Sequence, residues 1–488
     1  MTNERKDAKM PLIDYLSLTQ AATSNGRDLS TAGTFDVINP ATGRVFAQAP
    51  AVTPEQLDEV FATAQSTFAT WKQDEGFRRD SLRKAADVVQ EAIEDLASII
   101  TAEQGKPLHE ARAEVGAAVV WLRYYADLET PNEIVRDDEV RFEAVEHRPL
   151  GVVSAITPWN FPITLAMFKI APALRAGNTM VLKPSPFTPL SSLALGSLLR
   201  GVLPDGVLNV VAGPEPLGAA MVTHPVPRKV TFTGSTVTGR QIARSAADDL
   251  KRVTLELGGN DPAIILDDAD VEQIAHQLFW SAFGNNGQIC AAVKRVYAHE
   301  SIQPQLVEAL AEIARSVKVD EGFVEGARLG PINNQPQFQR VSALVTDAIS
   351  NGARVAAGGA PIEREGYFFQ PTILDRVTDG IRIVDEEQFG PALPVISFRD
   401  EDDAIARANN SEYGLTASIW SGDTERAATI ARQIDAGQVS INGHGSGALP
   451  HLPFGGHKQS GIGVENGLWG LRSFTEPLVI TGPSRQQR

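Results

Sequence analysis

Cysteine is almost absent from this chain: among its 488 residues, only Cys290 carries a thiol. A lone thiol cannot form an intramolecular disulfide or a thiol cluster for zinc, and it is typical of a reducing compartment. Long apolar runs are also absent, so the sequence predicts no transmembrane helix. Residues 1–10 are polar and lack the apolar core of a signal peptide. We therefore expect a cytoplasmic protein that does not cross a membrane.

Basic residues are in deficit. Lysine and arginine number 44 against 60 aspartates and glutamates, which gives a net charge of −16. This balance disfavours general binding to nucleic acid or to an anionic membrane surface. No metal-ligand motif such as H-E-x-x-H occurs, so no metal is expected. A small molecule is therefore the expected partner.

The length and the apolar pattern predict two α/β domains. A single hydrophobic core stops growing at about 250–300 residues, and this chain is much longer. From residue 151 onward, short apolar runs alternate with helical segments, which is typical of a parallel sheet with crossover helices. The first series of predicted strands covers residues 151–156, 178–182, 207–211, 229–232 and 252–255, and a second series begins near residue 262 and continues past residue 440.

Several other segments are interpreted from local pattern. Residues 1–30 are polar, and we expect them to be loosely attached. Apolar spacing and capping residues predict one helix that starts at Thr53 and a second over residues 77–103. Residues 132–147 and 477–481 fit neither domain and are interpreted as extension strands for subunit contact.

Cys290, in the segment Gly-Gln-Ile-Cys-Ala, admits two interpretations. A lone cysteine is most often a small buried apolar residue. As a nucleophile it would need a lowered pKa or a nearby base, together with donors for an oxyanion. Cys290 alone does not decide between the two, so the decision depends on the neighbouring motifs.

Glu256 and Asn160 could supply those groups. Glu256 ends an apolar strand and is followed by glycines, and α/β sheets bind ligands at the carboxyl ends of their strands. Asn160 stands between Pro158 and Pro162, which stiffen its loop, so that its amide could donate to an oxyanion. A solvated carboxylate and a proline-rich turn are the alternatives.

Two further strand ends are candidates for binding a nucleotide. Gly234 and Ser235 lie between a strand and a helix, where a hydroxyl and helix-start N–H groups could hold a pyrophosphate. Lys183 ends another strand and could donate to ribose hydroxyls. The glycines at 234 and 239 do not form the common G-x-G-x-x-G, so this motif alone is a weak signal.

The order and spacing of these motifs resemble the aldehyde dehydrogenase superfamily from about residue 39 to residue 473. Further landmarks of that family match residues 39–43, 103–107, 386–391 and 453–461. The resemblance implies an α/β fold with two doubly wound parallel-sheet domains and a small β extension. It implies a Rossmann-like NAD(P)-binding domain at 1–130 and 148–256, a catalytic domain at 257–460, and an oligomerisation extension at 131–147 and 474–488.

The resemblance also implies the oxidation of an aldehyde to a carboxylic acid. Cys290 would attack the aldehyde carbon, and the Asn160 amide and the Cys290 N–H would hold the oxyanion of the thiohemiacetal. After hydride transfer to the cofactor, Glu256 would activate the water that hydrolyses the thioester. Glu465 matches a second family carboxylate that relays protons near Glu256, and a charged residue at a helix start is the alternative.

For the cofactor, the resemblance implies that Lys183 binds the adenosine ribose, Ser235 the pyrophosphate and Glu387 the nicotinamide ribose. Trp159 would lie beside the cofactor, and Phe389 would pack against the nicotinamide. Residues of the same motifs complete the expected site: Ile156, Thr157, Pro158, Ser185, Pro186, Gly234, Thr238, Leu257 and Gly258.

Pro186 departs from the family pattern. NAD-preferring members usually carry a glutamate there, which binds both ribose hydroxyls and would repel a 2′-phosphate. Its loss removes both effects, and no arginine obviously replaces it. NAD is therefore the expected cofactor, with NADP the alternative. Thr238, where the family usually has valine or isoleucine, is a smaller departure.

The expected aldehyde site is apolar and partly aromatic, which favours a medium-sized uncharged aldehyde over betaine aldehyde. The loop 443–452 matches the family's substrate loop in position but not in composition. Its histidines, His444 and His451, are interpreted as surface residues, with contact to a polar substituent as the alternative. By alignment with the family, five residues should surround the aldehyde: Phe161, Leu165, Phe168, Ile289 and Ala291.

Family members are dimers or tetramers, so a homodimer or homotetramer is expected. Other functions are less compatible with the motifs. Relatives that acylate coenzyme A typically lack the glutamate at 256. A silent binding or structural protein on this fold would be expected to lose Cys290, Glu256 or Asn160, and all three are present. A cysteine hydrolase would need a histidine base, and no histidine lies in a motif beside Cys290.

Overall fold

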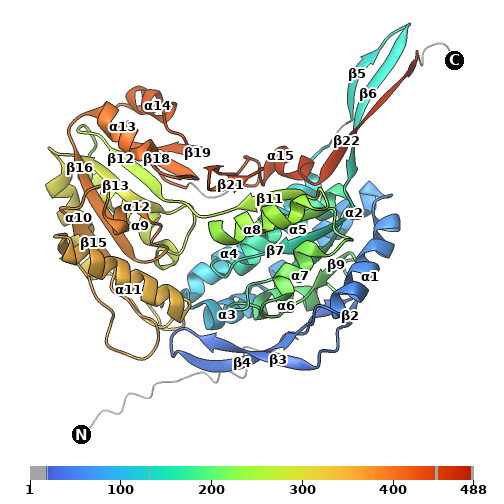
Figure 1. The fold of residues 1–488 in the computed structure, drawn as a ribbon, viewed down its shortest axis with the longest axis horizontal. Coiled ribbons are helices and arrows are strands. Elements are labelled where there is room, and N and C mark those ends of the chain that lie inside the picture. The colour runs from blue at the N-terminus through green and yellow to red at the C-terminus, as the bar shows by residue number, and fades with distance from the viewer. Residues whose placement is uncertain (1–17, 19, 131, 446–448, 485–488) are drawn as a thin grey trace.

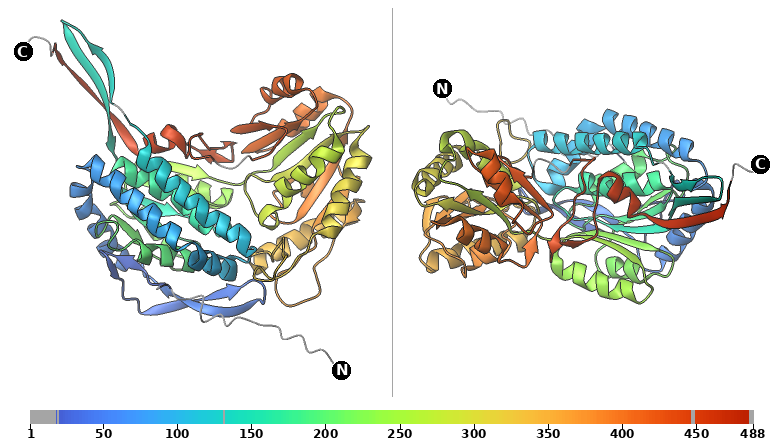
Figure 2. Two further views of the ribbon diagram at one scale, coloured as in Figure 1. Left: turned by 180° about the vertical axis from the view of Figure 1, so that it is seen from behind. Right: turned by 90° about the horizontal axis from the view of Figure 1, so that it is seen from above.

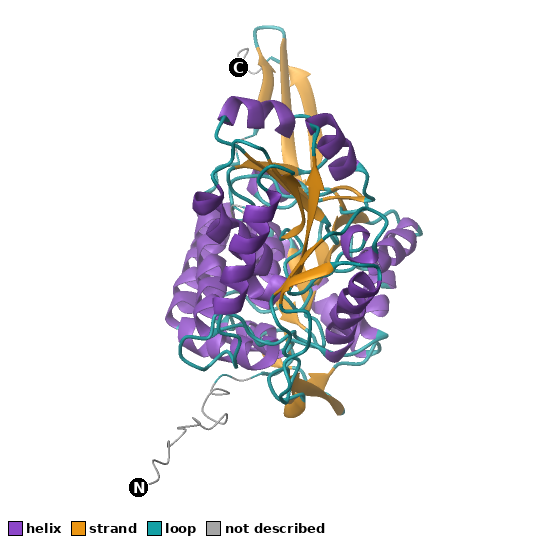
Figure 3. Cartoon of the chain, turned by 90° about the vertical axis from the view of Figure 1, so that its left-hand side faces the viewer, coloured by secondary structure: helices purple, strands orange, loops and turns teal. Residues whose placement is uncertain are grey.

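The computed structural model describes residues 18, 20–130, 132–445 and 449–484. Figure 1 shows two α/β bodies, each built around its own sheet, and a smaller β-sheet that projects away from them. Figure 3 shows helices on both sides of the strands. The predicted α/β fold with two doubly wound sheets is confirmed.

The first sheet has eight strands among the described residues, in the order β2-β1-β9-β8-β7-β10-β11-β21. The strands from β9 to β11 are parallel and mostly buried, because helices cover both faces. The order reverses beside β7, and a reversal of this kind opens a ligand-binding crevice at the carboxyl ends of the strands. The strands are β1 (Thr23–Ser24), β2 (Arg27–Asp28), β7 (Val152–Ile156), β8 (Thr179–Lys183), β9 (Leu208–Val210), β10 (Lys229–Thr233), β11 (Arg252–Glu256) and β21 (Gly461–Ile462).

Two groups of helices pack around this sheet, and Figure 2 shows the N-terminal group from behind. The apolar faces of these helices supply much of the largest core of the protein. The helices are α1 (Gln56–Trp71), α2 (Glu75–Glu91), α3 (Ile93–Gln104), α4 (Leu108–Asp127), α5 (Pro162–Ala176), α6 (Leu190–Leu198), α7 (Leu217–Thr223), α8 (Thr236–Ala247) and the late α15 (Gly467–Arg472).

Several local predictions near the N-terminus are wrong. Helix α1 begins at Gln56 rather than at Thr53, although Gln56 Oε1 accepts the expected bond from the Thr53 N–H at 3.1 Å. The helix predicted over 77–103 is two helices that meet at Ala92. No proline or glycine causes this break; α2 packs mainly against α4, whereas α3 packs against α4 and α6, and this tertiary packing overrides local propensity.

The N-terminal segment is also better attached than the sequence predicts. Strand β1 pairs with β9, and Ala22 beside it is fully buried. The expectation of a loosely attached segment is therefore wrong for residues 20–28, while residues 1–17 and 19 lie outside the described residues.

The second sheet, as far as the structure describes it, has seven strands in the order β14-β15-β16-β13-β12-β18-β19. All its neighbours are parallel except β14. Its strands are β12 (Asp261–Ile265), β13 (Val293–His299), β14 (Arg354–Ala357), β15 (Thr372–Asp375), β16 (Ala392–Phe398), β18 (Thr416–Trp420) and β19 (Gln438–Ile441). Its helices are α9 (Val271–Phe283), α10 (Gln303–Ser316), α11 (Gln335–Ser350), α12 (Arg382–Asp385), α13 (Glu401–Asn409) and α14 (Thr424–Ala431), with the short 3₁₀ helix η2 (Gly284–Gly287) after α9.

A three-stranded antiparallel sheet, with β6 between β22 and β5, forms the projecting extension. It contains both segments that were interpreted as extension strands; residues 485–488 lie outside the described part of the chain. No helix in the described ranges combines the length and apolar character needed to cross a membrane. The remaining strands are β5 (Glu133–Asp137), β6 (Arg141–Pro149) and β22 (Thr475–Pro483), and the pairs β3 (Gly33–Asn39) with β4 (Arg44–Ala51) and β17 (Tyr413–Gly414) with β20 (His457–Lys458).

Candidate active site

Cys290 lies in a tight loop between η2 and β13. Three consecutive residues before it have left-handed backbone: Asn285 at φ 47°, Asn286 at φ 59° and Gly287 at φ 71°. Asparagine tolerates this region better than most residues. At Gly287 a side chain is excluded outright, because a Cβ there would lie 2.3 Å from the carbonyl oxygen of Gly390. The Gly-Asn-Asn-Gly sequence thus explains how the chain turns sharply enough to present Cys290.

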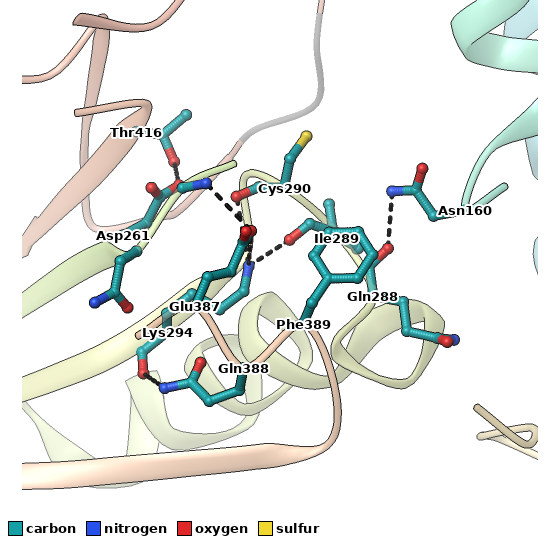
Figure 4. Close-up of polar contacts among 12 residues, drawn as sticks. Asn160, Asp261, Gln288, Ile289, Cys290, Lys294, Glu387, Gln388, Phe389 and Thr416 are labelled. Carbon is teal, nitrogen blue, oxygen red and sulfur yellow. Dashed lines mark hydrogen bonds and ion pairs between the residues drawn. The ribbon is translucent and has the colours of Figure 1, made fainter. Parts of the chain in front are cut away.

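Asn160 lies opposite Cys290, in the loop between β7 and α5. Its side-chain Nδ2 donates to the carbonyl of Gln288 at 2.9 Å, as Figure 4 shows. Its own carbonyl accepts from Lys106 Nζ at 2.8 Å and from Asn285 Nδ2 at 3.0 Å. An amide nitrogen carries two hydrogens, so one N–H of Asn160 is left to donate to a ligand.

Glu256 ends β11 and is buried, with 3% of its surface exposed. No described residue donates a hydrogen bond to either of its carboxylate oxygens. Burial raises the pKa of Glu256 well above its usual value; the charge of Glu465 raises it further, and that of Lys169 lowers it. Lys169 Nζ contacts Glu465 at 2.5 Å and donates to Thr233 at 2.7 Å. The sequence motifs did not indicate Lys169, because a lysine inside an apolar helix has no recognisable role until its partner is known.

Two cavities meet at Cys290 and Asn160, which line both of them. The first has a volume of about 400 Å³ and opens at the reversal of the first sheet, between the loops after β7 and β10. The second has a volume of about 780 Å³ and lies between α4, α5 and α9. The crevice of the first sheet can hold a nucleotide on one side of the thiol, and the apolar cavity can hold a small molecule on the other side.

The predicted residues fall on the expected sides of Cys290. All five predicted substrate residues, Phe161, Leu165, Phe168, Ile289 and Ala291, line the second cavity. Eight predicted cofactor residues line the first: Pro158, Trp159, Gly234, Ser235, Leu257, Gly258, Glu387 and Phe389. The other six do not line it: Ile156, Thr157, Lys183, Ser185, Pro186 and Thr238. They lie nearby, since the Thr157 N–H donates to the Lys183 carbonyl at 3.1 Å and Thr238 donates to Ser235 Oγ at 3.2 Å. Glu256 and Glu465 line neither cavity.

The cofactor-side cavity has the features of a nucleotide site. Ser235 is the N-cap of α8, so the first turn of that helix offers backbone N–H groups. The absence of a side chain at Gly258 leaves room for the Glu387 carboxylate, because a Cβ there would lie 2.5 Å from one of its oxygens. Trp159 and Phe389 meet edge to face with 5.3 Å between their ring centres. These residues fit a dinucleotide with a flat aromatic end.

His444 corrects one interpretation of the loop 443–452. It is not a surface residue: it is buried, lines the second cavity, and contacts Ser418 Oγ at 2.9 Å and Thr416 Oγ1 at 3.2 Å. Burial lowers the pKa of His444 to about 3, so the ring is neutral. His451 is exposed, and residues 446–448 of the loop lie outside the described residues.

The Cys290 thiol is in an unfavourable environment for ionisation. Burial raises its pKa to about 12; Lys294 lowers the pKa, whereas Glu387, Asp261 and Glu256 raise it. Lys294 and Asp261 are further residues that sequence patterns missed, because neither belongs to a motif. The free chain therefore holds Cys290 as a protonated thiol at neutral pH.

Comparison with known proteins identifies the family. The aldehyde dehydrogenase family model matches residues 28–480. An aldehyde dehydrogenase of a Fusarium species, LUC3, is 40% identical over 93% of this chain and 96% of its own length. The Escherichia coli succinate-semialdehyde dehydrogenase [NADP(+)] GabD is 37% identical over 96% and 98%. The structure of the NAD+ complex of an aldehyde dehydrogenase from Bacillus cereus has a TM-score of 0.94 at 37% identity and covers 99% of this chain and 100% of that one.

The chain therefore belongs to the aldehyde dehydrogenase family. It is an oxidoreductase that oxidises an aldehyde with NAD or NADP.

The raised pKa of Cys290 predicts slow alkylation. At pH 8, iodoacetamide should modify Cys290 more slowly than a free thiol of ordinary pKa near 8.5, because far less thiolate is present. The rate should still rise about tenfold per pH unit between pH 8 and pH 10. Because Cys290 is the only cysteine, mass spectrometry of the peptide that contains it separates thiol alkylation from the alkylation of lysines at high pH. A rate that levels off below pH 9 would contradict the prediction.

Proposed function

We propose that the protein oxidises an uncharged aldehyde to its carboxylic acid through a thioester on Cys290, with water as the final acyl acceptor. The observation that carries this proposal is the position of Cys290, where the cofactor-side cavity and the apolar cavity meet. An aldehyde in the apolar cavity can therefore reach the thiol and the cofactor side at once.

Cys290 loses its thiol proton to solvent and attacks the aldehyde carbon as the thiolate, so that the carbonyl oxygen becomes the oxyanion of a thiohemiacetal. The free N–H of the Asn160 amide and the backbone N–H of Cys290 donate to that oxyanion. Loss of one such donor typically lowers the rate by about 10²–10³. The oxidised nicotinamide, when bound, supplies the hydride acceptor. What remains on Cys290 is a thioester.

Glu256 acts next, as the base that takes a proton from the hydrolytic water. A raised pKa makes a carboxylate a stronger base near neutral pH. Glu465, held by Lys169, is the second carboxylate and receives the proton from Glu256. The second proton of the water goes to the departing sulfur, so the products are the carboxylate and the free Cys290 thiol.

The cofactor is held by the residues around the first cavity. Ser235 and the start of α8 hold the pyrophosphate, Glu387 the nicotinamide ribose, and Trp159 and Phe389 flank the nicotinamide. Lys183 and the other predicted cofactor residues that do not line the cavity complete the adenosine end.

Glu215 favours NAD over NADP. It lies in the loop after β9, beside the Lys183 end of β8. Burial lowers the pKa of Lys183, and the charge of Glu215 raises it, so the two groups are within electrostatic reach of each other. Glu215 supplies the ribose-binding carboxylate that Pro186 cannot, and it repels a 2′-phosphate.

The substrate cavity disfavours anionic aldehydes. Among the described residues that line it there is no lysine or arginine. Its carboxylates are Glu110 and Glu114, and Glu114 is neutralised by Lys106 Nζ at 2.6 Å. Aromatic rings supply much of the remaining wall, with Trp121 stacked on Phe168 at 4.8 Å. An uncharged aldehyde of medium size fits this lining best.

Two variants test the proposed mechanism. Cys290→Ala should abolish turnover of aldehyde, because no other residue carries a thiol. Glu256→Gln should lower steady-state turnover about 10²–10⁴-fold while a burst of reduced cofactor remains, because hydride transfer precedes hydrolysis. Stopped-flow absorbance records the burst, and mass spectrometry of the intact protein detects the acyl group. Retained turnover in Cys290→Ala would contradict the thioester mechanism. If the wild type, supplied with coenzyme A, released acyl-coenzyme A instead of the acid, the role of water as acyl acceptor would be contradicted.

An aldehyde panel measured with each cofactor tests both selectivities. For benzaldehyde and hexanal, kcat/KM should exceed that for succinic semialdehyde by at least about tenfold, a difference that corresponds to about 1.4 kcal/mol. In the wild type, kcat/KM measured with NAD should exceed kcat/KM measured with NADP. Glu215→Gln should lower this NAD/NADP ratio about tenfold, because the repulsion of the 2′-phosphate is lost. An unchanged cofactor ratio in Glu215→Gln would show that Glu215 does not select the cofactor.

We also propose the expected division into domains and the expected subcellular location. The first sheet supports residues 1–130 and 148–256 as the cofactor domain, and the second supports 257–460 as the catalytic domain. Strand β21, which pairs with β11, lies just beyond that boundary. A cytoplasmic location remains the expectation from the single thiol.

The extension supports a homodimer or homotetramer. Strand β5 is fully exposed and lies at an edge of its sheet, as does β22. Apolar side chains remain exposed on these strands, with Val135 at 66% and Val479 at 65%. An exposed apolar edge strand is stable in solution when another chain covers it. A second copy of this chain is the proposed cover.

Lysine on these strands should weaken the assembly. Val135→Lys with Val479→Lys should lower the mass measured by size-exclusion chromatography with light scattering, because charge would enter the subunit contact. Val45→Lys is the matched control, since Val45 is 49% exposed on β4, which is outside the extension. A wild-type protein that already elutes as a monomer would contradict the oligomer.

A further inference from the structure

Lys294 is a buried cation directly beneath the Cys290 loop. Its side chain is 2% exposed, and it is the second residue of β13. Its Nζ donates to the Ile289 carbonyl and lies 3.4 Å from the Cys290 carbonyl oxygen. Figure 4 shows this ammonium below the loop and close to the Glu387 carboxylate. The nearest Glu387 oxygen is 4.0 Å away, so the positive charge is held mainly by carbonyl groups and is only partly neutralised.

Asp261 is the opposing charge in the same pocket. It begins β12, is 1% exposed, and pairs in register with Val293, the neighbour of Lys294. Thr416 Oγ1 donates to its carboxylate at 2.5 Å. Burial raises the pKa of Asp261 to about 7, and the charge of Lys294 lowers it. Above pH 8, Asp261 is therefore predominantly a carboxylate.

The contact with Ile289 also orients the next peptide N–H. The peptide between Ile289 and Cys290 is planar, and in a trans peptide the C=O and the N–H point in opposite directions. Because Lys294 draws the Ile289 carbonyl inward, the Cys290 N–H points away from Lys294. No described residue accepts a hydrogen bond from that N–H.

We propose that Lys294 is a positioning residue: it aims the Cys290 N–H at the oxyanion and supplies the positive field that favours the Cys290 thiolate, against the opposing charge of Asp261. The inference rests on the proposed role of Cys290. The charged groups that act on the thiol are Lys294, which lowers its pKa, and Glu387, Asp261 and Glu256, which raise it. His444, the other titratable group near Lys294, is neutral.

The test uses two substitutions with opposite expected signs. In the full-length enzyme, Lys294→Met should slow alkylation of Cys290 by iodoacetamide about tenfold at pH 8–9, which corresponds to a rise of about one pKa unit. Asp261→Asn should accelerate alkylation, because a negative charge near the thiol is removed. General damage to the loop cannot slow alkylation in one variant and accelerate it in the other. Lys294→Met should also lower kcat for benzaldehyde, because the Cys290 N–H is no longer aimed.

Lys251→Met is the matched control. Lys251 is another buried lysine whose Nζ donates to two carbonyls, those of Val222 and His224, each at 2.7 Å, and it lies away from both cavities. Its loss should leave the alkylation profile unchanged. The inference is overturned if Lys294→Met alkylates like the wild type, or if Asp261→Asn shifts alkylation in the same direction as Lys294→Met. If Lys294→Met does not fold, Asp261→Asn alone decides, since a failure to accelerate overturns the inference. The alkylation rate reports the reactivity of the Cys290 thiol whether or not turnover uses that thiol. Failure of the proposed mechanism is detected by a different experiment, the turnover assay of Cys290→Ala.

Discussion

The hydrogen bond from the Asn160 amide to the Gln288 carbonyl joins the two sheets at the point where both cavities meet. Asn160 follows β7 of the first sheet, and Gln288 precedes β13 of the second. Lys106 and the Asn285 side chain hold the Asn160 carbonyl from the other side. The positions of the proposed oxyanion donor, Asn160, and of the Cys290 loop therefore depend on each other, and a shift of either sheet would separate them. This bond explains why residues far apart in the sequence lie at one place.

A buried ion pair, Lys106 with Glu114, connects the Asn160 loop to the neighbouring helices. Lys106 and Glu114 are fully buried, and the same Glu114 carboxylate accepts from the Ile163 N–H at the start of α5. Breaking a buried pair by removing one partner typically costs about 3–5 kcal/mol, whereas an apolar replacement of both partners can be neutral. Such a pair is therefore weak evidence for stability. Its hydrogen bonds to the Asn160 carbonyl and the Ile163 N–H connect the Asn160 loop to α4 and α5.

Sequence patterns predicted the parts of this architecture that local chemistry determines. Apolar runs marked the parallel strands, and strand-end motifs marked Glu256, Asn160 and the turn at Ser235. Cys290 was marked as the only cysteine, and the family resemblance implied its role. The helix break at Ala92 was missed because only packing against α4 and α6 determines it. Lys169, Lys294 and Asp261 were missed for a related reason: each is a charged residue inside an apolar element, and its meaning depends on a partner far away in the chain. His444 was misassigned because a glycine-rich loop resembles an exposed one until β18 is placed beside it.

The two proposed reaction steps each require a negative charge on a different acidic group. Attack requires a thiolate at Cys290, and hydrolysis requires a carboxylate at Glu256, yet burial raises the pKa of both groups, and the charge of Glu256 raises that of Cys290. Both charges together are therefore the least favourable state. Two separate buried lysines oppose this effect: Lys294 lowers the pKa of Cys290, and Lys169 lowers the pKa of Glu256. Because the proposed nucleophile and the proposed base have different lysines beside them, the ionisation of one does not depend on the cation of the other, and the proposed attack and hydrolysis can occur at different stages.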